Sequence, residues 1–321
     1  MVQKINNKIV VILGPTASGK SGLALKLAKK FNGEIVCADS RQVYDEMAIG
    51  TASPFQMKNH KEKSKKIDGI EHHLFNIIKP NKKFSVGQYQ KLAIKTIKNI
   101  QKRGKIPFLV GGTGLYIKSI VDNLQFPKLK PSPKLRKELE QKTALQLFAI
   151  YKELDKKGAK QIDKNNKRRL TRAIEVCRVT GKPFWEQRQK QTPLFDVLQI
   201  GLDVPKPELE KRITKRTKKM LKAGLEKEVK KLVKKYGWTL VLQNTIGYSE
   251  WQLPGNFQKG GYRVTSYSTI QKAQINQLIS LHTVQYAKRQ MTWFKKNERI
   301  LWVKNYQESA RKISRFTNDG K

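Results

Sequence analysis

The first third of the chain alternates between short apolar runs and segments with helical spacing. Residues 9–13 (IVVIL) form a continuous apolar run that leads into a glycine, as is typical of a strand buried on both faces of a parallel sheet. Apolar residues between positions 23 and 31 then recur every three to four residues, and Asn32-Gly33 supplies a helix stop. Residues 34–38 (EIVCA) predict a second short strand, with Asp39 at its carboxyl end.

The same alternation continues to about residue 125. Apolar positions from Val86 to Ile100 predict an amphipathic helix, which a strand over residues 106–110 follows. Strands that alternate with helices predict a parallel sheet with helices on both faces. Because ligands bind at the carboxyl ends of such strands, three loops should converge on one site, namely 14–21, 39–42 and 111–114.

The pattern changes near Phe126. Prolines at 127, 131 and 133 lead into strongly charged, helical sequence that extends to about Lys190. We therefore expect an all-helical insertion at residues 127–195, within an α/β core formed by residues 1–126 and 196–321. The second part of this core should contain a strand at 197–203, helices at 207–235 and 270–296, a Gly-rich loop at 252–270 and a last strand at 300–303.

Length and composition limit the class of protein. A chain of 321 residues with 38% apolar residues can form one large domain with an insertion, or two domains. No run approaches the roughly 18 apolar residues that span a membrane, and no signal-peptide pattern precedes the first strand. Cys37 and Cys177 lack metal-ligand spacing and are expected to be reduced thiols. We expect a cytoplasmic protein that is monomeric and does not bind a membrane.

The charge is unusually positive. Lys and Arg number 67 against 25 acidic residues, which gives a formal net charge of +42. A polyanionic partner would explain such an excess, because neutralised phosphates release condensed counterions. A lysine-rich composition, spread over solvated helix faces, would explain much of it as well. Charge alone therefore supports nucleic acid only weakly.

The first loop carries a specific motif. Gly14-Pro15-Thr16-Ala17-Ser18-Gly19-Lys20-Ser21 fits the pattern GxxxxGK[ST] and lies between a predicted strand and a predicted helix, as the motif requires. Backbone N–H groups of such a loop cradle phosphate, the lysine reaches terminal phosphate oxygens, and the Ser21 hydroxyl suits Mg²⁺. The motif does not decide between a nucleotide and another pyrophosphate.

The other two loops leave alternatives open. Asp39 is a candidate helix cap, a candidate Mg²⁺ ligand, or a general base that faces the substrate across from the phosphate loop. Gly111-Gly112-Thr113-Gly114 is either a tight strand-to-helix turn or a place of close approach to a ligand, with Thr113 projecting into the crevice.

Two further patterns have ordinary explanations beside the functional ones. His72 and His73 lack a carboxylate at zinc-site spacing, so we expect them to be structural. Basic clusters lie at 167–172, 211–216 and 288–294, and the third interleaves arginine with aromatic residues that could stack on unpaired bases. Each cluster could equally be a solvated helix face.

The motifs together are more specific than any one of them. The stretches GPTASGKS, ADSRQVY, IGTA, GIEHHL, PFLVGGTGLYI, RRLTRAIEV, TGKP, IGY and YAKRQMTWF occur in this order along the chain. They resemble the tRNA dimethylallyltransferase family, over about residues 8 to 303 and in its bacterial form without a zinc finger. This resemblance implies an α/β fold, namely a P-loop NTPase-like parallel sheet flanked by helices, with an inserted all-helical subdomain that binds tRNA.

The resemblance also implies an activity. The family transfers a dimethylallyl group from dimethylallyl diphosphate to N6 of adenine 37, beside the anticodon, in tRNAs that read codons beginning with U. The implied partners are dimethylallyl diphosphate and the tRNA anticodon stem-loop, and the implied cofactor is Mg²⁺ on Ser21. Loop 14–21 would hold the diphosphate and Asp39 would be the general base. Thr113 would lie near the adenine, and Arg216, or its neighbour Arg212, would contact the diphosphate.

The resemblance further implies a set of tRNA contacts. They are Asp39, Ser40, Arg41, Gln42, Arg136, Arg168, Arg169, Arg172, Gly247, Tyr248, Lys288, Arg289, Gln290 and Trp293. The chain departs from the family pattern at Ser53, where a lysine is usual, and in HHLFNIIKP, which lacks an acidic residue. The alternative functions are a P-loop small-molecule kinase, which explains Lys20 and Ser21 but not the basic clusters, and an RNA-binding ATPase.

Overall fold

The computed structural model describes residues 7–55, 65–127, 129, 132–187, 191–252, 257–258, 261–262 and 267–318. The chain divides into two compact units, of which the first comprises residues 1–121 with 194–321 and the second comprises Asp122–Pro193. The expected insertion was 127–195.

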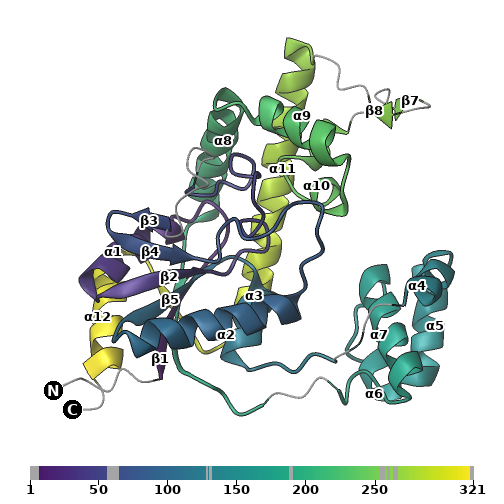
Figure 1. Ribbon diagram of the computed structural model, residues 1–321, viewed down its shortest axis with the longest axis horizontal. Helices are drawn as coiled ribbons and strands as arrows, with labels where there is room; N and C mark the ends of the chain where they lie inside the picture. Colours follow the sequence, from purple (N-terminus) through teal and green to yellow (C-terminus); the bar gives the residue numbers. More distant parts are fainter. Residues whose placement is uncertain are drawn as a thin grey trace. The chain divides into compact units, whose positions relative to one another are not determined.

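The first unit is built on a seven-stranded sheet with the order β3-β4-β2-β5-β1-β6-β9 (Figure 1). Its strands are β1 Lys8–Leu13, β2 Gly33–Cys37, β3 Lys65–Ile67, β4 Ile70–His73, β5 Ile106–Gly111, β6 Asp196–Leu202 and β9 Ile300–Val303. All neighbouring pairs are parallel except β3 with β4. The expectation of a parallel sheet was therefore wrong at this edge, because Asp68 and Gly69 both take left-handed φ angles and turn β3 back on β4 as a hairpin.

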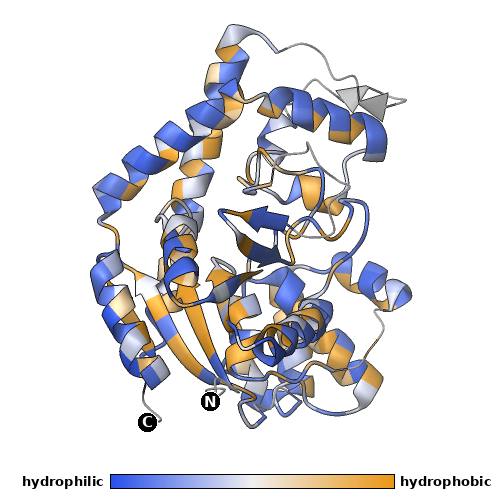
Figure 2. Cartoon of the chain, turned by 60° about the vertical axis from the view of Figure 1, so that its left-hand side comes forward, coloured by the Kyte–Doolittle hydropathy of each residue, from blue (hydrophilic) through white to orange (hydrophobic). Residues whose placement is uncertain are grey.

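Successive residues of the central strands face two separate layers of helices. Ile9, Val11 and Leu13 of β1 belong to a core with α2 (Val86–Lys102), α3 (Gly114–Val121), α9 (Leu225–Tyr236) and α11 (Thr269–Phe294). Val10 and Ile12 belong to a second core with α1 (Lys20–Lys30) and α12 (Tyr306–Asn318). Figure 2 shows this pattern as apolar strands between helices whose outer faces are polar. Both faces of the sheet are covered, as the apolar strand runs predict.

The remaining elements of this unit are α8 (Lys206–Lys222), α10 (Leu240–Gln243), the 3₁₀ turn η1 (Ser249–Trp251) and the short pair β7 (Phe257–Gln258) and β8 (Gly261–Tyr262). The single helix expected at 207–235 is divided into α8 and α9, because Gly224 takes a left-handed φ of 96° that stops one helix and starts the next. The loop expected at 252–270 falls largely on residues outside those described.

The second unit is helical and has its own core. Its helices are α4 (Pro133–Glu140), α5 (Ala144–Leu154), α6 (Lys156–Ala159) and α7 (Lys167–Thr180). Leu139, Leu147, Tyr151, Leu170 and Ile174 form the centre of that core. Ser132, Thr143 and Asn166 cap α4, α5 and α7 through side-chain oxygens that accept backbone N–H bonds, so these helix starts follow from the local sequence.

Candidate active site

The phosphate loop, residues 14–21, joins β1 to α1. Gly19 precedes the helix with a left-handed φ of 90° and offers no side chain to cap it. The first N–H groups of α1 therefore lack a capping partner and remain available to an anion, where the helix dipole also favours negative charge. Thr16, Lys20 and Ser21 line the adjoining pocket.

Lys20 is held within this pocket. Its ammonium donates to the Pro15 carbonyl at 3.1 Å. Burial lowers the pKa of Lys20 to about 8, an effect that Asp39 opposes and Arg216 reinforces. A bound diphosphate would restore the charge of this ammonium.

Asp39 follows β2 at the same edge of the sheet. Its Oδ1 accepts from the backbone N–H of Arg41 at 2.9 Å and of Gln42 at 3.4 Å. The carboxylate thus caps the turn after β2 and its direction is fixed, but no helix follows, so the helix-cap alternative was wrong. Its second oxygen makes no hydrogen bond within the part of the chain that the structure describes, and Asp39 lines the pocket.

The turn after β5 is held against Asp39's turn. Thr113 Oγ1 accepts from the Ser40 backbone N–H at 2.9 Å and also bonds to the Tyr286 hydroxyl. Thr113 does not line the pocket itself, but Ser40 and Tyr286 do. Thr113 was expected to project into the crevice. In the structure it instead bonds to Ser40 and Tyr286, which do line the pocket.

The glycines of this turn pack closely against other parts of the protein. A Cβ on Gly111 would lie 2.1 Å from the Ala38 carbonyl oxygen, and one on Gly112 would lie 2.3 Å from Gln290 Nε2. A Cβ on Gly114 would lie 2.3 Å from the Trp293 ring. Close packing against the end of β2 and against α11 thus requires these glycines, which agrees with the tight-turn alternative.

Two arginines from α8 reach the phosphate loop, in different ways. Arg216 lines the pocket and donates to Thr16 Oγ1 at 3.2 Å, and burial lowers its pKa while Asp39 opposes that change. Arg212 donates to the Ser18 carbonyl at 3.2 Å and pairs with Glu208 at 2.8 Å. Only Arg216 of the two lines the pocket, so it is the better placed to meet an anion bound there.

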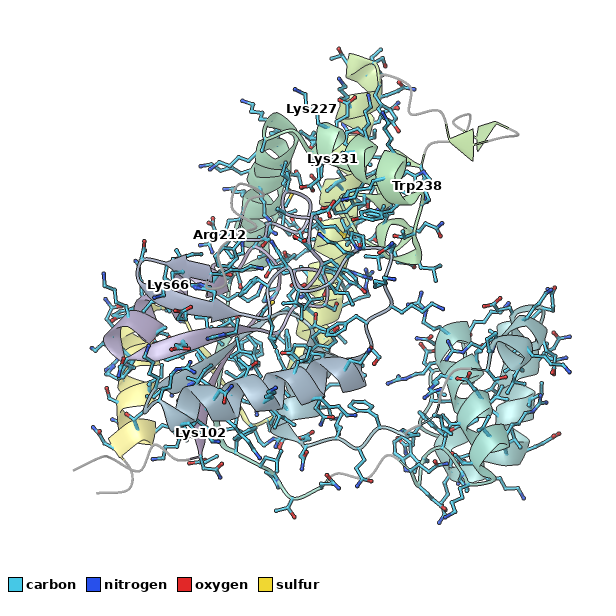
Figure 3. The ribbon with its side chains drawn as sticks, viewed as in Figure 1. Lys66, Lys102, Arg212, Lys227, Lys231 and Trp238 are labelled. Carbon is cyan, nitrogen blue, oxygen red and sulfur yellow. The ribbon has the colours of Figure 1, made fainter. Side chains whose placement is uncertain are left out.

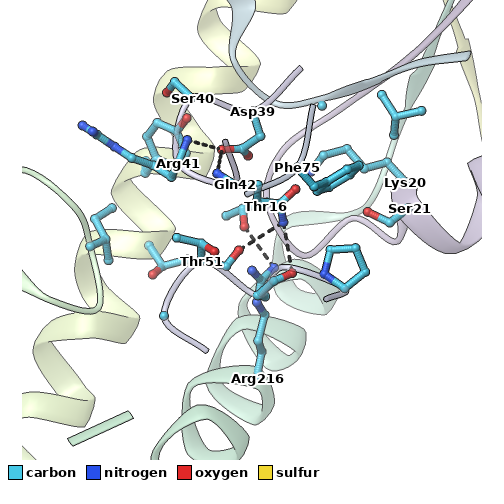
Figure 4. A pocket seen from close by; sticks show the side chains of 18 of the residues that line it. Thr16, Lys20, Ser21, Asp39, Ser40, Arg41, Gln42, Thr51, Phe75 and Arg216 are labelled. Carbon is cyan, nitrogen blue, oxygen red and sulfur yellow. Dashed lines mark hydrogen bonds between the residues drawn. The ribbon is translucent and has the colours of Figure 1, made fainter. Parts of the chain in front are cut away.

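These groups surround one cavity of about 580 Å³ (Figure 4). Figure 4 shows Lys20 and Ser21 on one side, Asp39 to Gln42 on another, and Arg216 approaching from α8. Apolar side chains supply part of the wall, including Ile213 and Met220 of α8 and Ile279 of α11. The cavity therefore offers an anion site, a carboxylate and an apolar surface together.

The loop Gly50–Ala52 closes another side of the cavity and is fixed from two directions. Gln42 donates to the carbonyls of Thr51 and Ala52 at 3.1 and 3.0 Å. Glu228, which is buried, accepts from the backbone N–H groups of Ile49 and Gly50 and from the Tyr248 hydroxyl at 2.6 Å. Glu228 and Tyr286 were missed by sequence reasoning. Tyr286 lies one helical turn before Gln290, and that spacing could have found it.

The tRNA contacts expected on α11 and near Tyr248 differ in exposure. Lys288, Arg289 and Trp293 are exposed on α11. Tyr248 and Gln290 are instead buried and fully engaged with the protein, so neither presents a side chain to a ligand. Gly247 lies next to Gly50 with a φ of 93°. Further basic side chains project from exposed positions, among them Lys227 and Lys231 of α9 in Figure 3.

The arginines of the second unit surround a buried carboxylate. Glu175 pairs with Arg136 at 2.8 Å and with Arg172 at 2.6 Å, and these bonds lower its pKa to about 2 although burial alone would raise it. Arg136 and Arg172 therefore stabilise this unit whatever else they bind. Arg168 is exposed and Arg169 half-buried at the start of α7.

The two histidines both bond within the protein, and His72 also lines the candidate active-site cavity. The His72 ring bonds to the Ile70 carbonyl, and His73 bonds to the buried carboxylate of Glu34 at 2.7 Å. Within the described ranges no three His, Cys, Asp or Glu side chains gather as a metal site.

Cys37 and Cys177 are buried free thiols, and burial raises the pKa of each. No helix among the described residues is long and apolar enough to cross a membrane.

The fold and the pocket define a P-loop enzyme in which one anion cradle faces a carboxylate across a partly apolar cavity. A family model described as IPP transferase matches residues 42–297. A protein named tRNA dimethylallyltransferase from Rippkaea orientalis is 43% identical over 298 residues, which are 93% of each chain. One of the same name from Carboxydothermus hydrogenoformans is 38% identical over 97% of this chain and 96% of its own.

Solved structures agree with these matches. A tRNA isopentenylpyrophosphate transferase from Staphylococcus epidermidis has a TM-score of 0.66 and 35% identity, with 98% of this chain and all of the other covered. A eukaryotic dimethylallyltransferase, solved in the act of modifying tRNA, has a TM-score of 0.75 and 27% identity, with 98% and 80% covered. The chain belongs to the tRNA dimethylallyltransferase, or IPP transferase, family.

Proposed function

We propose that this protein transfers a dimethylallyl group from dimethylallyl diphosphate to N6 of adenine 37 in the anticodon stem-loop of tRNAs that read codons beginning with U. The observation that carries this proposal is the placement of Asp39, Lys20 and Arg216 around one cavity at the ends of β1 and β2. A carboxylate opposite an anion cradle suits a reaction that removes a proton from one substrate and diphosphate from the other.

The residues have distinct parts in this reaction. The free oxygen of Asp39 accepts the proton of the adenine amine as the bond between N6 and the allylic carbon forms. The bond from that carbon to the diphosphate oxygen breaks, and the released charge is stabilised by the N–H groups of the phosphate loop, by Lys20 and by Arg216. Ile213, Met220 and Ile279 supply an apolar surface for the five-carbon group. An adenine must leave its stack to reach such a cavity.

The donor set suits Mg²⁺. Ser21 presents a hydroxyl to the cavity that contains the phosphate loop, and Mg²⁺ ordinarily takes few protein oxygens and completes its shell with substrate phosphate and water. The small number of acidic side chains here is consistent with that preference. When bound, the ion would neutralise charge on the diphosphate.

The exposed basic residues of α9 and α11 would contact tRNA. We propose that the enzyme acts as a monomer.

One experiment separates this function from the kinase and ATPase alternatives. Unmodified tRNA with adenines at 36 and 37 is incubated with Mg²⁺ and either labelled dimethylallyl diphosphate or labelled ATP. We expect label from the former to enter tRNA, and Asp39→Asn to lower the rate by about 10²- to 10⁴-fold, as the loss of a general base does. Asp196→Asn, an exposed change at the far end of β6, is the matched control. Turnover of ATP without prenyl transfer would refute the proposal.

A further inference from the structure

Gln290 joins the phosphate loop to the turn after β5, against which the turn that carries Asp39 is held. Its Oε1 accepts from the Thr16 backbone N–H at 2.8 Å, and its Nε2 donates to the Gly112 carbonyl at 2.8 Å. Thr16 belongs to the phosphate loop, while Gly112 precedes Thr113. Since an N–H can only donate and a carbonyl can only accept, these partners also fix the orientation of the amide.

The bridge lies beyond the last paired residues of the two strands. The register of β1 with β5 ends at Leu13 and Gly111, so the pairing of these two strands does not extend to Thr16 and Gly112. Gln290 is 5% exposed, and a Cβ on Gly112 would collide with its Nε2. The amide of Gln290 therefore fits only because residue 112 has no side chain, and the contact is buried within the protein.

Gln290 is part of a stripe along α11. Tyr286, Gln290 and Trp293 stand at positions i, i+4 and i+7, which share one helix face. They contact three successive residues of the turn after β5: Tyr286 bonds to Thr113, Gln290 bonds to Gly112, and Trp293 packs where a side chain on Gly114 would stand. Of these three, only Gln290 also bonds to the phosphate loop.

Contacts continue from both ends of the bridge to the proposed reacting groups. On one side, Arg216 donates to Thr16 Oγ1. On the other, Thr113 accepts from the Ser40 N–H, next to Asp39. We propose that Gln290 is a positioning residue: it sets the distance between the cradle for the diphosphate and the turn after β5, which in turn holds the turn of Asp39, and so aligns the allylic carbon with the adenine amine. This inference rests on the proposed function.

Alignment of this kind should affect the rate more than binding. A displacement of about 1 Å between reacting groups can cost about 100-fold in rate. Gln290→Met keeps the length and burial of the side chain and removes both hydrogen bonds. We therefore expect kcat to fall by about 100-fold while KM for either substrate changes by less than about 3-fold. Gln277→Met, an exposed change on the same helix, should leave both constants unchanged.

Gln290→Glu provides a readout that a merely structural role would not give. A carboxylate still accepts from Thr16 but repels the Gly112 carbonyl, whereas the protonated acid donates to it as the amide does. The activity of this variant relative to wild type should therefore rise as the pH falls from about 8.5 to about 5.5. The corresponding ratio for Gln290→Met should stay constant.

Three results would overturn the inference, each in folded protein as judged by circular dichroism. They are a kcat of Gln290→Met within about 2-fold of wild type, a loss that falls on KM alone, and a Gln290→Glu ratio that does not vary with pH. Absence of prenyl transfer by wild type would instead refute the proposed function. The two failures are thus distinguishable.

Discussion

The rate of the reaction at low dimethylallyl diphosphate should fall above about pH 8, because Lys20 loses its charge there. Burial lowers the pKa of its ammonium from the ordinary 10.5 to about 8 in the free protein, with Asp39 opposing and Arg216 adding to the effect. At pH 7 about nine-tenths of the molecules would then carry a charged Lys20, and at pH 9 about one-tenth. If only the charged form binds diphosphate productively, kcat/KM for dimethylallyl diphosphate should fall about tenfold between these pH values.

The assay is the pH profile of initial rates at saturating tRNA. Because kcat/KM reports the free enzyme and kcat the substrate complex, the two profiles should differ. A bound diphosphate favours the charged ammonium, so the alkaline limit in kcat should move to higher pH. Lys20→Arg replaces the ammonium with a guanidinium that stays charged, and its kcat/KM should remain level to about pH 10, whatever its absolute rate.

Either of two results would refute this reasoning. A wild-type kcat/KM that stays level to about pH 10 would mean that Lys20 keeps its ordinary pKa, or that its charge is not needed. A limit near pH 8 that persists in Lys20→Arg would assign the titration to another group. The affinity for inorganic pyrophosphate, measured over the same pH range, provides an independent check that does not depend on the chemical step.

The other predictions concern the cavity wall and the sheet. Arg216→Met should lower kcat by about 10²- to 10³-fold, and Arg212→Met by less than about tenfold, in steady-state assays; similar losses would contradict the roles given to them. Gly50→Ala would place a Cβ 2.4 Å from the buried Tyr248 ring, and should cost about 1–3 kcal/mol in denaturant unfolding. For Glu34, burial raises the pKa, but bonds from Lys105 and His73 and the charge of Arg103 outweigh it, and the net pKa is lowered. Its contribution to stability is therefore present above its unfolded pKa of about 4.3 and is lost as the pH falls through the folded value. The stability difference between wild type and Glu34→Gln should narrow over that acidic range, and a constant difference would contradict the assignment.

The central sheet could be predicted because burial on both faces leaves a continuous apolar run. The expected strands at 9–13, 34–38, 106–110 and 300–303 correspond to β1, β2, β5 and β9. Their parallel order brings loops 14–21, 39–42 and 111–114 to one edge, as expected. The apolar periodicity of α2 was equally clear.

Features that depend on single backbone angles were missed. Asp68-Gly69 is a strong hairpin signal, but the strands on either side are too short to stand out by periodicity. Gly224 interrupts a helical pattern that reads as continuous through it. Helix α12, which covers the second core, was not expected at all, although its apolar positions at 310 and 313 pack against the sheet.

Site residues could be predicted where the residue type itself indicates the chemistry. They could not be predicted where tertiary packing determines what a side chain contacts. Lys20, Asp39 and Arg216 line one cavity. Tyr248 and Gln290 fall within stretches that resemble tRNA contacts, yet both are buried, because pattern cannot tell a polar side chain that faces solvent from one that bonds a neighbouring loop. Glu228 was missed for the same reason, because a glutamate among many lysines has the pattern of a surface residue.

The most direct test of the account is the identity of the reaction product. tRNA treated with wild-type enzyme, Mg²⁺ and dimethylallyl diphosphate is digested to nucleosides and analysed by mass spectrometry, while released diphosphate is counted. We expect one N6-dimethylallyladenosine, located at position 37, for each diphosphate released. We expect none in tRNA with guanine at 37, and at least about 100-fold less in the same time with Asp39→Asn enzyme. A modified adenosine elsewhere, diphosphate released without modification of tRNA, or undiminished product from the Asp39→Asn enzyme would contradict the account.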